Sequence, residues 1–445
     1  MKTVQICEYD SLIAGSENGL HKDGYVTLKR DAFELLERFL LTEQGKEDAP
    51  ELMHISRRRG VGDVITAKNY VGLIALKDGT AIEILPKIHT QDDSDGKTAK
   101  KLVLDMLRTL PDFPSRTAQV AGVDLSRLDI FEIFIRMFLD EVYSVAKRGL
   151  KCGYEAVEEN SSRFKGKLIF SQQMRKNLLH KERSYIRYDV FSVNRPENRI
   201  LKAALELLFR RTRSHHSRTD IKNLLQSFVE VETSSNFRGD FQKCGKDRNV
   251  KDYAAALQWS RVFLTGESFT NYAGSEEAFA LLFPMERLFE SYIAAQLKRH
   301  LDSSVYTVTA QEGSRWLFDD PKSFSVRPDL VIRKGGEVFI LDTKWKVLNP
   351  DKPNGGISQA DMYQMCAYQR KWGARHTTLI YPKPAYSTDA IPKSYYAEDG
   401  TQIRLWFVDL LNLEESIREL EARFSFGAAV RFPNFCNIPE VRNKL

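Results

Sequence analysis

The stretch SVRPDLVIRKGGEVFILDTKW, residues 325–345, decides how the C-terminal third of the chain folds. Two apolar runs flank Gly335-Gly336, and a glycine pair readily adopts the positive φ angles of a two-residue turn. The stretch therefore predicts a β-hairpin in which Lys334 pairs with Glu337. By the same register, Asp329 lies opposite Asp342.

Opposed side chains of a hairpin share one face, with Cβ atoms roughly 4.5–5.5 Å apart. Two carboxylates placed in this way repel each other, and a divalent cation turns that repulsion into chelation. Mg²⁺ prefers one or two carboxylates together with water and substrate phosphate. Lys344 lies two residues after Asp342 and so points to the same face, where its ammonium group can orient or deprotonate the attacking water or stabilise developing negative charge. The hairpin thus predicts a Mg²⁺-dependent hydrolytic site at Asp329, Asp342 and Lys344.

A plain ion pair between Lys344 and either aspartate is the alternative interpretation. The strand around Asp342 is otherwise apolar, which predicts burial on both faces. A buried aspartate and lysine destabilise a fold by several kcal/mol unless they are paired or bound to a metal. Both interpretations meet that condition, so the hairpin alone leaves them open.

Two predicted helices flank the hairpin. Residues 285–300 carry an apolar stripe, and Glu290 lies on its flank, where it can serve as a further metal ligand. Glu286 competes for that role, and a surface glutamate is the alternative for either residue. In the second helix, residues 358–372, Asp361, Gln364 and Tyr368 are spaced so that they share one face. That face either lines the site or is solvated.

Residue periodicity divides the chain into three regions. Residues 1–120 are rich in predicted strands, residues 121–273 are mainly helical, and residues 274–445 follow the order helix, strand, strand, helix, strand. The fold class is α+β or α/β, with a mixed sheet flanked by helices in the last region. A further basic strand is predicted within residues 161–170.

The first region contains two features that bear on function or fold. Residues 69–76 and 80–88 flank Lys77-Asp78-Gly79, and Asp-Gly between apolar runs indicates a hairpin. Before it, SRRRGVGDV combines Arg57, Arg58 and Arg59 with two glycines, which predicts an exposed, flexible loop.

Composition limits the remaining possibilities. A length of 445 residues suggests two or three domains, and a net charge of +6 is compatible with a polyanionic partner without establishing one. Five scattered cysteines without a CxxC pair argue against a zinc site and for a reducing compartment. Since no apolar run approaches the roughly 20 residues of a membrane span and no signal peptide is visible, we expect a cytoplasmic protein that does not bind membranes.

Several of these stretches resemble a known family. Pro328-Asp329 followed by Asp342-Thr343-Lys344 on an apolar strand resembles the PD-(D/E)xK nuclease motif. The hairpin is similar to that of McrC, the nuclease subunit of McrBC modification-dependent restriction systems. The same similarity extends to PMERLFESYI (284–293), QADMYQMCAY (359–368), LIYP (379–382), EILPKI (83–88), RGLKCGYEAVEENSSRFKGKL (148–168) and DVFSVNRPENRILKAAL (189–205), and so to most of the chain.

The resemblance implies a C-terminal PD-(D/E)xK endonuclease domain, residues 274–445, that cuts both strands of DNA with Mg²⁺. Asp329 and Asp342 would bind the metal, Lys344 would be the catalytic lysine and Glu290 a supporting acid and metal ligand. The implied partner is an McrB-like AAA+ hexamer that hydrolyses GTP, recognises modified cytosine and translocates DNA. The N-terminal region would bind this ring and stimulate its GTPase, and the nuclease subunit would dimerise through the assembly. The chain has no GxxxxGK[ST] motif, in agreement with GTP binding by the partner alone.

Arg57, Arg58 and Arg59 are our candidates for the ring contact, because an arginine supplied in trans can stabilise charge in phosphoryl transfer. A solvated loop that contacts the DNA backbone is the alternative. The basic residues Arg163, Lys165 and Lys167 leave the same choice between phosphate contact and surface charge.

Two other functions compete with the nuclease. One is a non-catalytic DNA-binding or adaptor subunit that retains the nuclease fold; the intact set of Asp329, Asp342 and Lys344 speaks against it. The other is a hydrolase of a different substrate such as RNA, which the sequence does not exclude.

Overall fold

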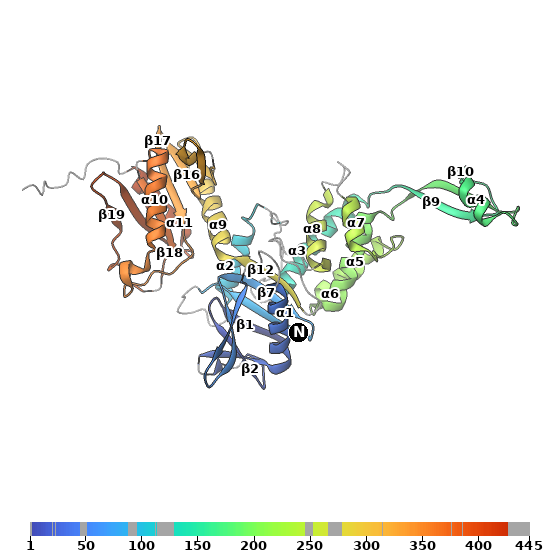
Figure 1. The fold of residues 1–445 in the computed structure, drawn as a ribbon, viewed down its shortest axis with the longest axis horizontal. Coiled ribbons are helices and arrows are strands. Elements are labelled where there is room, and N and C mark those ends of the chain that lie inside the picture. Colours follow the sequence, from blue (N-terminus) through green and yellow to red (C-terminus); the bar gives the residue numbers. More distant parts are fainter. Residues whose placement is uncertain are drawn as a thin grey trace, which may run out of the picture. The chain divides into compact units, whose positions relative to one another are not determined.

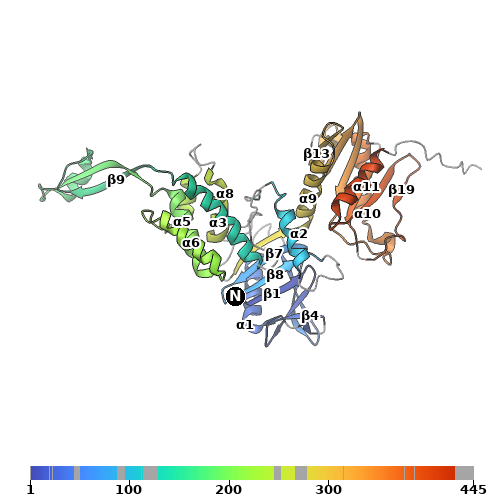
Figure 2. The same cartoon turned by 180° about the vertical axis from the view of Figure 1, so that it is seen from behind.

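The computed structural model describes residues 2–19, 21–22, 24–44, 51–87, 96–111, 113, 129–244, 252–265, 278–313, 315–374, 376–384 and 386–425. The chain forms two compact units, Met1–Tyr292 and Ile293–Leu445, and Figures 1 and 2 show the fold from opposite sides. The division falls within helix α9 (Met285–His300), whose bounds match the prediction. Within the described residues, no helix is both long and apolar enough to cross a membrane.

The first unit begins with two sheets that pack around helix α1 (Arg30–Gln44). A five-stranded sheet has the order β3-β4-β2-β6-β5 and a four-stranded sheet the order β1-β8-β7-β12. Their strands are β1 (Lys2–Cys7), β2 (Ser11–Gly15), β3 (His21–Lys22), β4 (Tyr25–Lys29), β5 (Met53–Arg58), β6 (Gly62–Ala67), β7 (Tyr70–Leu76), β8 (Thr80–Leu85) and β12 (Ala278–Pro284). The predicted hairpin around Asp78-Gly79 is confirmed as β7 and β8, which pair antiparallel.

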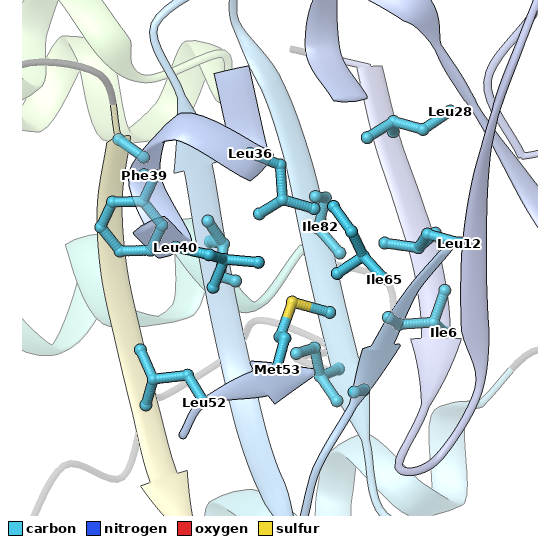
Figure 3. Close-up of a cluster of buried hydrophobic side chains, with 14 of the residues drawn as sticks. Ile6, Leu12, Leu28, Leu36, Phe39, Leu40, Leu52, Met53, Ile65 and Ile82 are labelled. Carbon is cyan, nitrogen blue, oxygen red and sulfur yellow. The ribbon is translucent and has the colours of Figure 1, made fainter. Parts of the chain in front are cut away.

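A continuous apolar core joins α1 to both sheets. Figure 3 shows Leu36 and Leu40 of α1 among strand residues such as Ile65 and Ile82, all of them almost fully buried. Each such side chain contributes about 1.5–3 kcal/mol when it leaves water. This core fixes the position of the β5-β6 hairpin, because Met53 and Ile65 belong to it.

The prediction of a flexible loop over residues 56–64 was wrong in part. Arg57 pairs with Asp63 and Arg58 with Gly62, so two of the three arginines lie on an ordered hairpin. Gly60 and Gly62, both with positive φ, supply the turn. The strand was missed because its arginine-rich end is exposed and has no apolar alternation. The predicted exposure is confirmed for residues 57–61 and Asp63, whereas Val64 is buried.

The middle of the chain contains helices α2 (Lys97–Leu107), α3 (Ile130–Arg148), α5 (Pro196–Arg211), α6 (His215–Ser227), α7 (Phe237–Cys244) and α8 (Ala254–Thr265). Three of them, α3, α5 and α8, lie where apolar periodicity predicts helices, over residues 128–147, 200–211 and 253–263. Aromatic contacts hold α3 to α8, with the rings of Phe134 and Trp259 5.6 Å apart and those of Phe138 and Phe263 also 5.6 Å apart.

The mainly helical region also contains a sheet that we did not predict. Strands β9 (Gly153–Ser161), β11 (Ser184–Ser192) and β10 (Lys167–Leu168) form it in the order β10-β11-β9, together with helix α4 (Phe170–Lys176). Of the strand expected over residues 161–170, only Ser161 at the end of β9 and the two residues of β10 are extended. The longer strands escaped prediction because, of all their residues, only Ile186 is buried, which leaves no apolar face to recognise.

The second unit is built on a mixed six-stranded sheet, as expected for this part of the chain. The strand order is β13-β16-β17-β18-β20-β19, with β16-β17 antiparallel and β17-β18-β20 parallel. The strands are β13 (Tyr306–Ala310), β16 (Leu330–Lys334), β17 (Glu337–Thr343), β18 (His376–Pro382), β19 (Ser394–Tyr396) and β20 (Gln402–Val408). A separate hairpin, β14 (Arg315–Asp319) and β15 (Lys322–Val326), precedes β16.

Helices lie on both faces of this sheet (Figures 1 and 2). Helix α10 (Gln359–Trp372) packs Met365 and Tyr368 against a face that includes Ile340. Helix α11 (Leu413–Ser425) packs against the other face, where the rings of Phe424 and Phe339 are 4.8 Å apart. Neighbouring residues of a strand point to opposite faces, so Phe339 and Ile340 separate the two layers.

The start of the predicted third region differs from the boundary of the second unit. We expected residues 274–445 to form one domain, whereas β12 pairs antiparallel with β7 and completes a sheet of the first unit. The apolar run AFALLFP directly precedes α9 in the sequence, and no local signal shows that its partner strand lies some 200 residues earlier.

Candidate active site

The hairpin that carries the candidate residues has the predicted register. Lys334 pairs with Glu337 and Leu330 with Leu341, and the intervening glycines have φ angles of 54° and 87°. Asp329 immediately precedes β16, so the next position in register is the one opposite Asp342.

Asp329 is held in place by the strand that it faces. Its Oδ2 accepts hydrogen bonds from the backbone N–H and the Oγ1 hydroxyl of Thr343, both at 2.7 Å, and its carbonyl accepts one from Gln311 N at 2.8 Å. Burial nevertheless raises the pKa of Asp329 more than these hydrogen bonds and the charge of Lys344 lower it. The Asp329 carboxylate is therefore well oriented, but the nearby positive charge does not fully offset the effect of burial.

Asp342 is the most enclosed acid of the site. Its side chain is 2% exposed, and its Oδ2 lies 2.7 Å from Lys344 Nζ in an ion pair. That oxygen has no well-aligned hydrogen bond from any described residue. Burial and then the charge of Asp329 raise the pKa of Asp342 to about 7, against the lowering effect of Lys344. Asp342 thus needs more positive charge than Lys344 supplies.

Lys344 connects the hairpin to α10. Its Nζ donates a hydrogen bond to Gln364 Oε1 at 3.2 Å and lies 3.7 Å from Asp361 Oδ1. Burial acts to lower the pKa of Lys344, but the charges of Asp342, Asp361 and Asp329 outweigh it and raise that pKa. Lys344 is therefore a cation at neutral pH. This favours stabilisation of negative charge over proton abstraction from water, two roles that the sequence left open.

The predicted polar face of α10 lines the site. Gln364 Nε2 donates to Tyr368 Oη at 2.7 Å, and that hydroxyl donates to the Arg327 carbonyl at 2.8 Å. A continuous series of hydrogen bonds thus runs from Lys344 to the backbone just before Asp329. Asp361 joins it only through its ion pair with Lys344.

The residues fit a divalent cation such as Mg²⁺. Two adjacent carboxylates, Asp329 and Asp342, share the hairpin, and one oxygen of Asp342 is buried without an aligned hydrogen bond. No group of three His, Cys, Asp or Glu side chains suited to a metal occurs among the described residues. Mg²⁺ needs no such group, because it binds through one or two carboxylates and keeps waters or substrate phosphate.

Glu286 and Glu290 of α9 belong to the first unit, and the residues just described belong to the second. Glu290 is half-buried, and its role as a supporting acid and metal ligand stays a prediction. Its competitor Glu286 is exposed and accepts a hydrogen bond from Asn69.

The three arginines of the β5-β6 hairpin have different surroundings. Arg57 is 83% exposed and its Nε lies 3.6 Å from Asp63 Oδ1. Arg58 donates to the Tyr25 hydroxyl at 2.8 Å and lies over its ring. Arg59, exposed at the turn, has no ion pair or hydrogen bond within the described part of the chain. Their role in partner binding stays a prediction, and Arg59 is the most available of the three.

The sheet β10-β11-β9 carries a second candidate surface, which the sequence analysis noted only for its charges. Arg163 and Lys167 are exposed, and Lys165 Nζ lies 3.9 Å from the centre of the Tyr188 ring. Large apolar side chains in and beside this sheet are also exposed: Tyr154, Phe164, Phe170, Met174, Leu178, Leu179 and Phe191 are all more than 60% exposed. Such a concentration indicates an interaction surface. The sequence held a signal for this surface, because Phe164, Phe170 and Leu178-Leu179 stand among basic residues.

Comparison with known proteins gives both sequence and fold relationships. The family model described as McrBC 5-methylcytosine restriction system component matches residues 65–382. A refined half-complex from a tetradecameric assembly of Thermococcus gammatolerans McrB AAA+ hexamers with bound McrC contains a chain that is 20% identical, with a TM-score of 0.62; the match covers 94% of this chain and 100% of that one. A cryo-EM structure of the T. gammatolerans McrBC complex matches at 20% identity over 68% and 89% of the two chains, with a TM-score of 0.46. No curated protein is similar enough in sequence to count as a relative.

Proposed function

The chain belongs to the family of McrBC 5-methylcytosine restriction system components, and on this premise we propose that it is the DNA-cutting subunit of a GTP-dependent complex directed at modified cytosine. The observation that carries the proposal is the buried pair Asp329 and Asp342 with Lys344 beside it. The mixed sheet with helices on both faces supports a PD-(D/E)xK nuclease fold for the second unit.

Each residue of the site has a part in the proposed hydrolysis. Asp329, oriented by Thr343, and Asp342 would hold the divalent cation. Mg²⁺ bound there would supply Lewis-acid activation of the scissile phosphodiester and of water. The Lys344 ammonium would stabilise the negative charge that develops on the phosphate. Gln364 keeps Lys344 in position through its own bond to Tyr368.

DNA cleavage tests this proposal directly. The chain is mixed with its GTPase partner, GTP, Mg²⁺ and methylated plasmid, and compared with Asp342→Ala and with a matched control at an exposed carboxylate, Asp351→Ala. We expect cleavage by the wild type and the control only. Equal cleavage by Asp342→Ala would rule out the site. Absence of cleavage by the wild type would favour the adaptor hypothesis, and cleavage of RNA in place of DNA would favour the other hydrolase.

We also propose that the partner is an AAA+ GTPase hexamer, by analogy with the assembly in which the similar chain is bound to McrB hexamers. Replacement of Arg57, Arg58 and Arg59 by alanine should lower stimulated GTP hydrolysis and leave the fold intact, because these side chains are exposed. Unchanged GTPase rates would exclude this hairpin. If Phe170→Ser with Met174→Ser lowered the rates instead, the contact would lie on helix α4, beside the β10-β11-β9 sheet.

A further inference from the structure

Tyr381 of β18 is a buried tyrosine whose hydroxyl has no hydrogen-bond partner in the part of the chain that the structure describes. Its side chain is fully buried, and the hydroxyl oxygen is enclosed without a donor or acceptor among the described residues. A buried hydroxyl without a partner destabilises a fold, and phenylalanine would fill the same space without that disadvantage. The hydroxyl therefore calls for an explanation other than packing.

The sheet register places Tyr381 beside the candidate site. In the parallel pair β17-β18, Asp342 pairs with Leu379 and Thr343 with Ile380, so Lys344 and Tyr381 occupy the next positions. Tyr381 belongs to the same buried cluster as Tyr368 of α10, which places it on the face that α10 covers. Burial raises the pKa of Tyr381 and the charges of Asp361 and Asp342 raise it further, in agreement with a hydroxyl close to both carboxylates.

Asp361 has the complementary deficiency. Its carboxylate has one partner, the Lys344 ammonium at 3.7 Å, and accepts no hydrogen bond from the residues that the structure describes. Lys344 is meanwhile much closer to Asp342, at 2.7 Å. The Tyr381 hydroxyl is thus an enclosed donor without an acceptor, and Asp361 of the covering helix α10 is a carboxylate without a donor whose charge acts on that hydroxyl.

We propose that Tyr381 is a positioning residue: its hydroxyl donates a hydrogen bond to Asp361 and holds that carboxylate against Lys344 once a divalent cation occupies Asp342. This inference rests on the proposed function, because a cation at Asp342 repels the ammonium, which must then rely on Asp361 and Gln364. Since its hydroxyl is enclosed, Tyr381 acts through Asp361 and does not touch DNA.

The test is Tyr381→Phe, measured in the full chain by thermal unfolding without divalent ions, by Ca²⁺ binding and by DNA cleavage with the partner. Unfolding should occur at the wild-type temperature or above it, because an unpartnered hydroxyl is removed. Ca²⁺ binding should weaken several-fold. The maximal cleavage rate should fall roughly tenfold or more, as for loss of one hydrogen bond to a charged group, with an unchanged KM for DNA.

Tyr306→Phe is the matched control. Tyr306 is buried in β13 of the same sheet, and its hydroxyl accepts a hydrogen bond from Lys334 at 3.1 Å, away from the candidate site. This variant should lower the unfolding temperature and leave Ca²⁺ binding and cleavage unchanged. Tyr381→Phe is thus expected to impair function without loss of stability, and Tyr306→Phe to lower stability without loss of function.

A double-mutant cycle with Asp361→Ala decides whether Tyr381 acts through Asp361. Tyr381→Phe should have little further effect in that background. The same fold-loss in both backgrounds, or wild-type Ca²⁺ affinity and rate for Tyr381→Phe, would overturn the proposal. If the wild type bound Ca²⁺ through Asp342 but cut no DNA, the proposed nuclease activity would be refuted. The effect of Tyr381→Phe on Ca²⁺ affinity would then decide the role of Tyr381. If the wild type bound no Ca²⁺, both proposals would fail.

Discussion

Replacement of Asp342 by asparagine should stabilise the metal-free protein at pH 8. Burial and the neighbouring Asp329 raise the pKa of Asp342 from 3.8 to about 7, so the folded protein resists the ionisation that the unfolded chain undergoes freely. Asparagine has nearly the same shape, carries no charge and keeps an oxygen that can accept from Lys344. The substitution therefore removes the disfavoured ionisation while it preserves the packing.

The magnitude follows from the two pKa values. The unfolded chain loses the Asp342 proton near pH 3.8 and the folded protein loses it near pH 7, so stability is highest below the first value and falls as pH rises to the second. Each pKa unit corresponds to about 1.4 kcal/mol, which sets an upper limit of about 4 kcal/mol for the whole range. Between pH 5 and pH 8, the advantage of Asp342→Asn over the wild type should grow by about 2.5 kcal/mol.

Urea unfolding followed by tryptophan fluorescence, with EDTA present, measures this difference. The signal reports mainly the second unit, because that unit contains four of the five tryptophans: Trp316, Trp345, Trp372 and Trp406. Asp351→Asn, at an exposed position, controls for the general effect of removing a carboxylate. Saturating Ca²⁺ should then stabilise the wild type and not Asp342→Asn, since a ligand that binds only the folded state shifts unfolding.

Equal pH dependence of the wild type and Asp342→Asn between pH 5 and pH 8 would refute the reasoning. Asp342 would then ionise as easily in the fold as in the unfolded chain, and Lys344 would compensate its burial completely. A plain ion pair between Lys344 and Asp342 would then explain the site, and no further cation would be needed to balance the charge of Asp342.

Two further variants examine the neighbours of Asp342. Lys344→Met should abolish detectable cleavage and lower the free energy of unfolding at pH 8 by up to about 3 kcal/mol, because Asp342 loses its nearest cation. Cleavage assays and urea unfolding measure the two effects. Cleavage by Lys344→Met at the wild-type rate would exclude a catalytic role for Lys344. Thr343→Val removes one of the two hydrogen bonds to Asp329 Oδ2. It should weaken Ca²⁺ binding, measured by calorimetry, and lower the free energy of unfolding by about 1 kcal/mol. An unchanged Ca²⁺ affinity would show that the backbone N–H of residue 343 suffices to orient Asp329.

The central part of the site could be predicted because local rules determine it. Gly335-Gly336 fixes the turn, the two-residue period of the strands fixes the faces, and Asp329 and Asp342 are only 13 residues apart. The helical spacing of Asp361, Gln364 and Tyr368 likewise placed them on one face. That Gln364 reaches Lys344 depends on how α10 packs on the sheet, and no local signal contains that information.

The features that escaped prediction lack a local signal for a physical reason. Strands β9 and β11 have almost no buried face, so their alternation carries no apolar pattern. Strand β12 pairs with a strand about 200 residues away, and its sequence is equally compatible with many partners. Tyr381 looks like any core tyrosine in LIYP, because an unpartnered hydroxyl is recognisable only when all its neighbours are known.

In the proposed function, the ion pair of Lys344 with Asp342, which the sequence offered as an alternative to a metal site, would be the resting state of such a site. An ionised Asp342 beside Asp329 requires a positive charge, and Lys344 supplies one at 2.7 Å without fully lowering the pKa of the acid. A divalent cation held by Asp342 would compete with that ammonium, which would lower its affinity for the resting protein. Displaced from Asp342, the ammonium still has Asp361 at 3.7 Å and Gln364 at 3.2 Å to hold it within reach of a phosphate. Such a site would favour the cation when DNA phosphate arrives with it, because the phosphate would then bind both the metal and the released lysine.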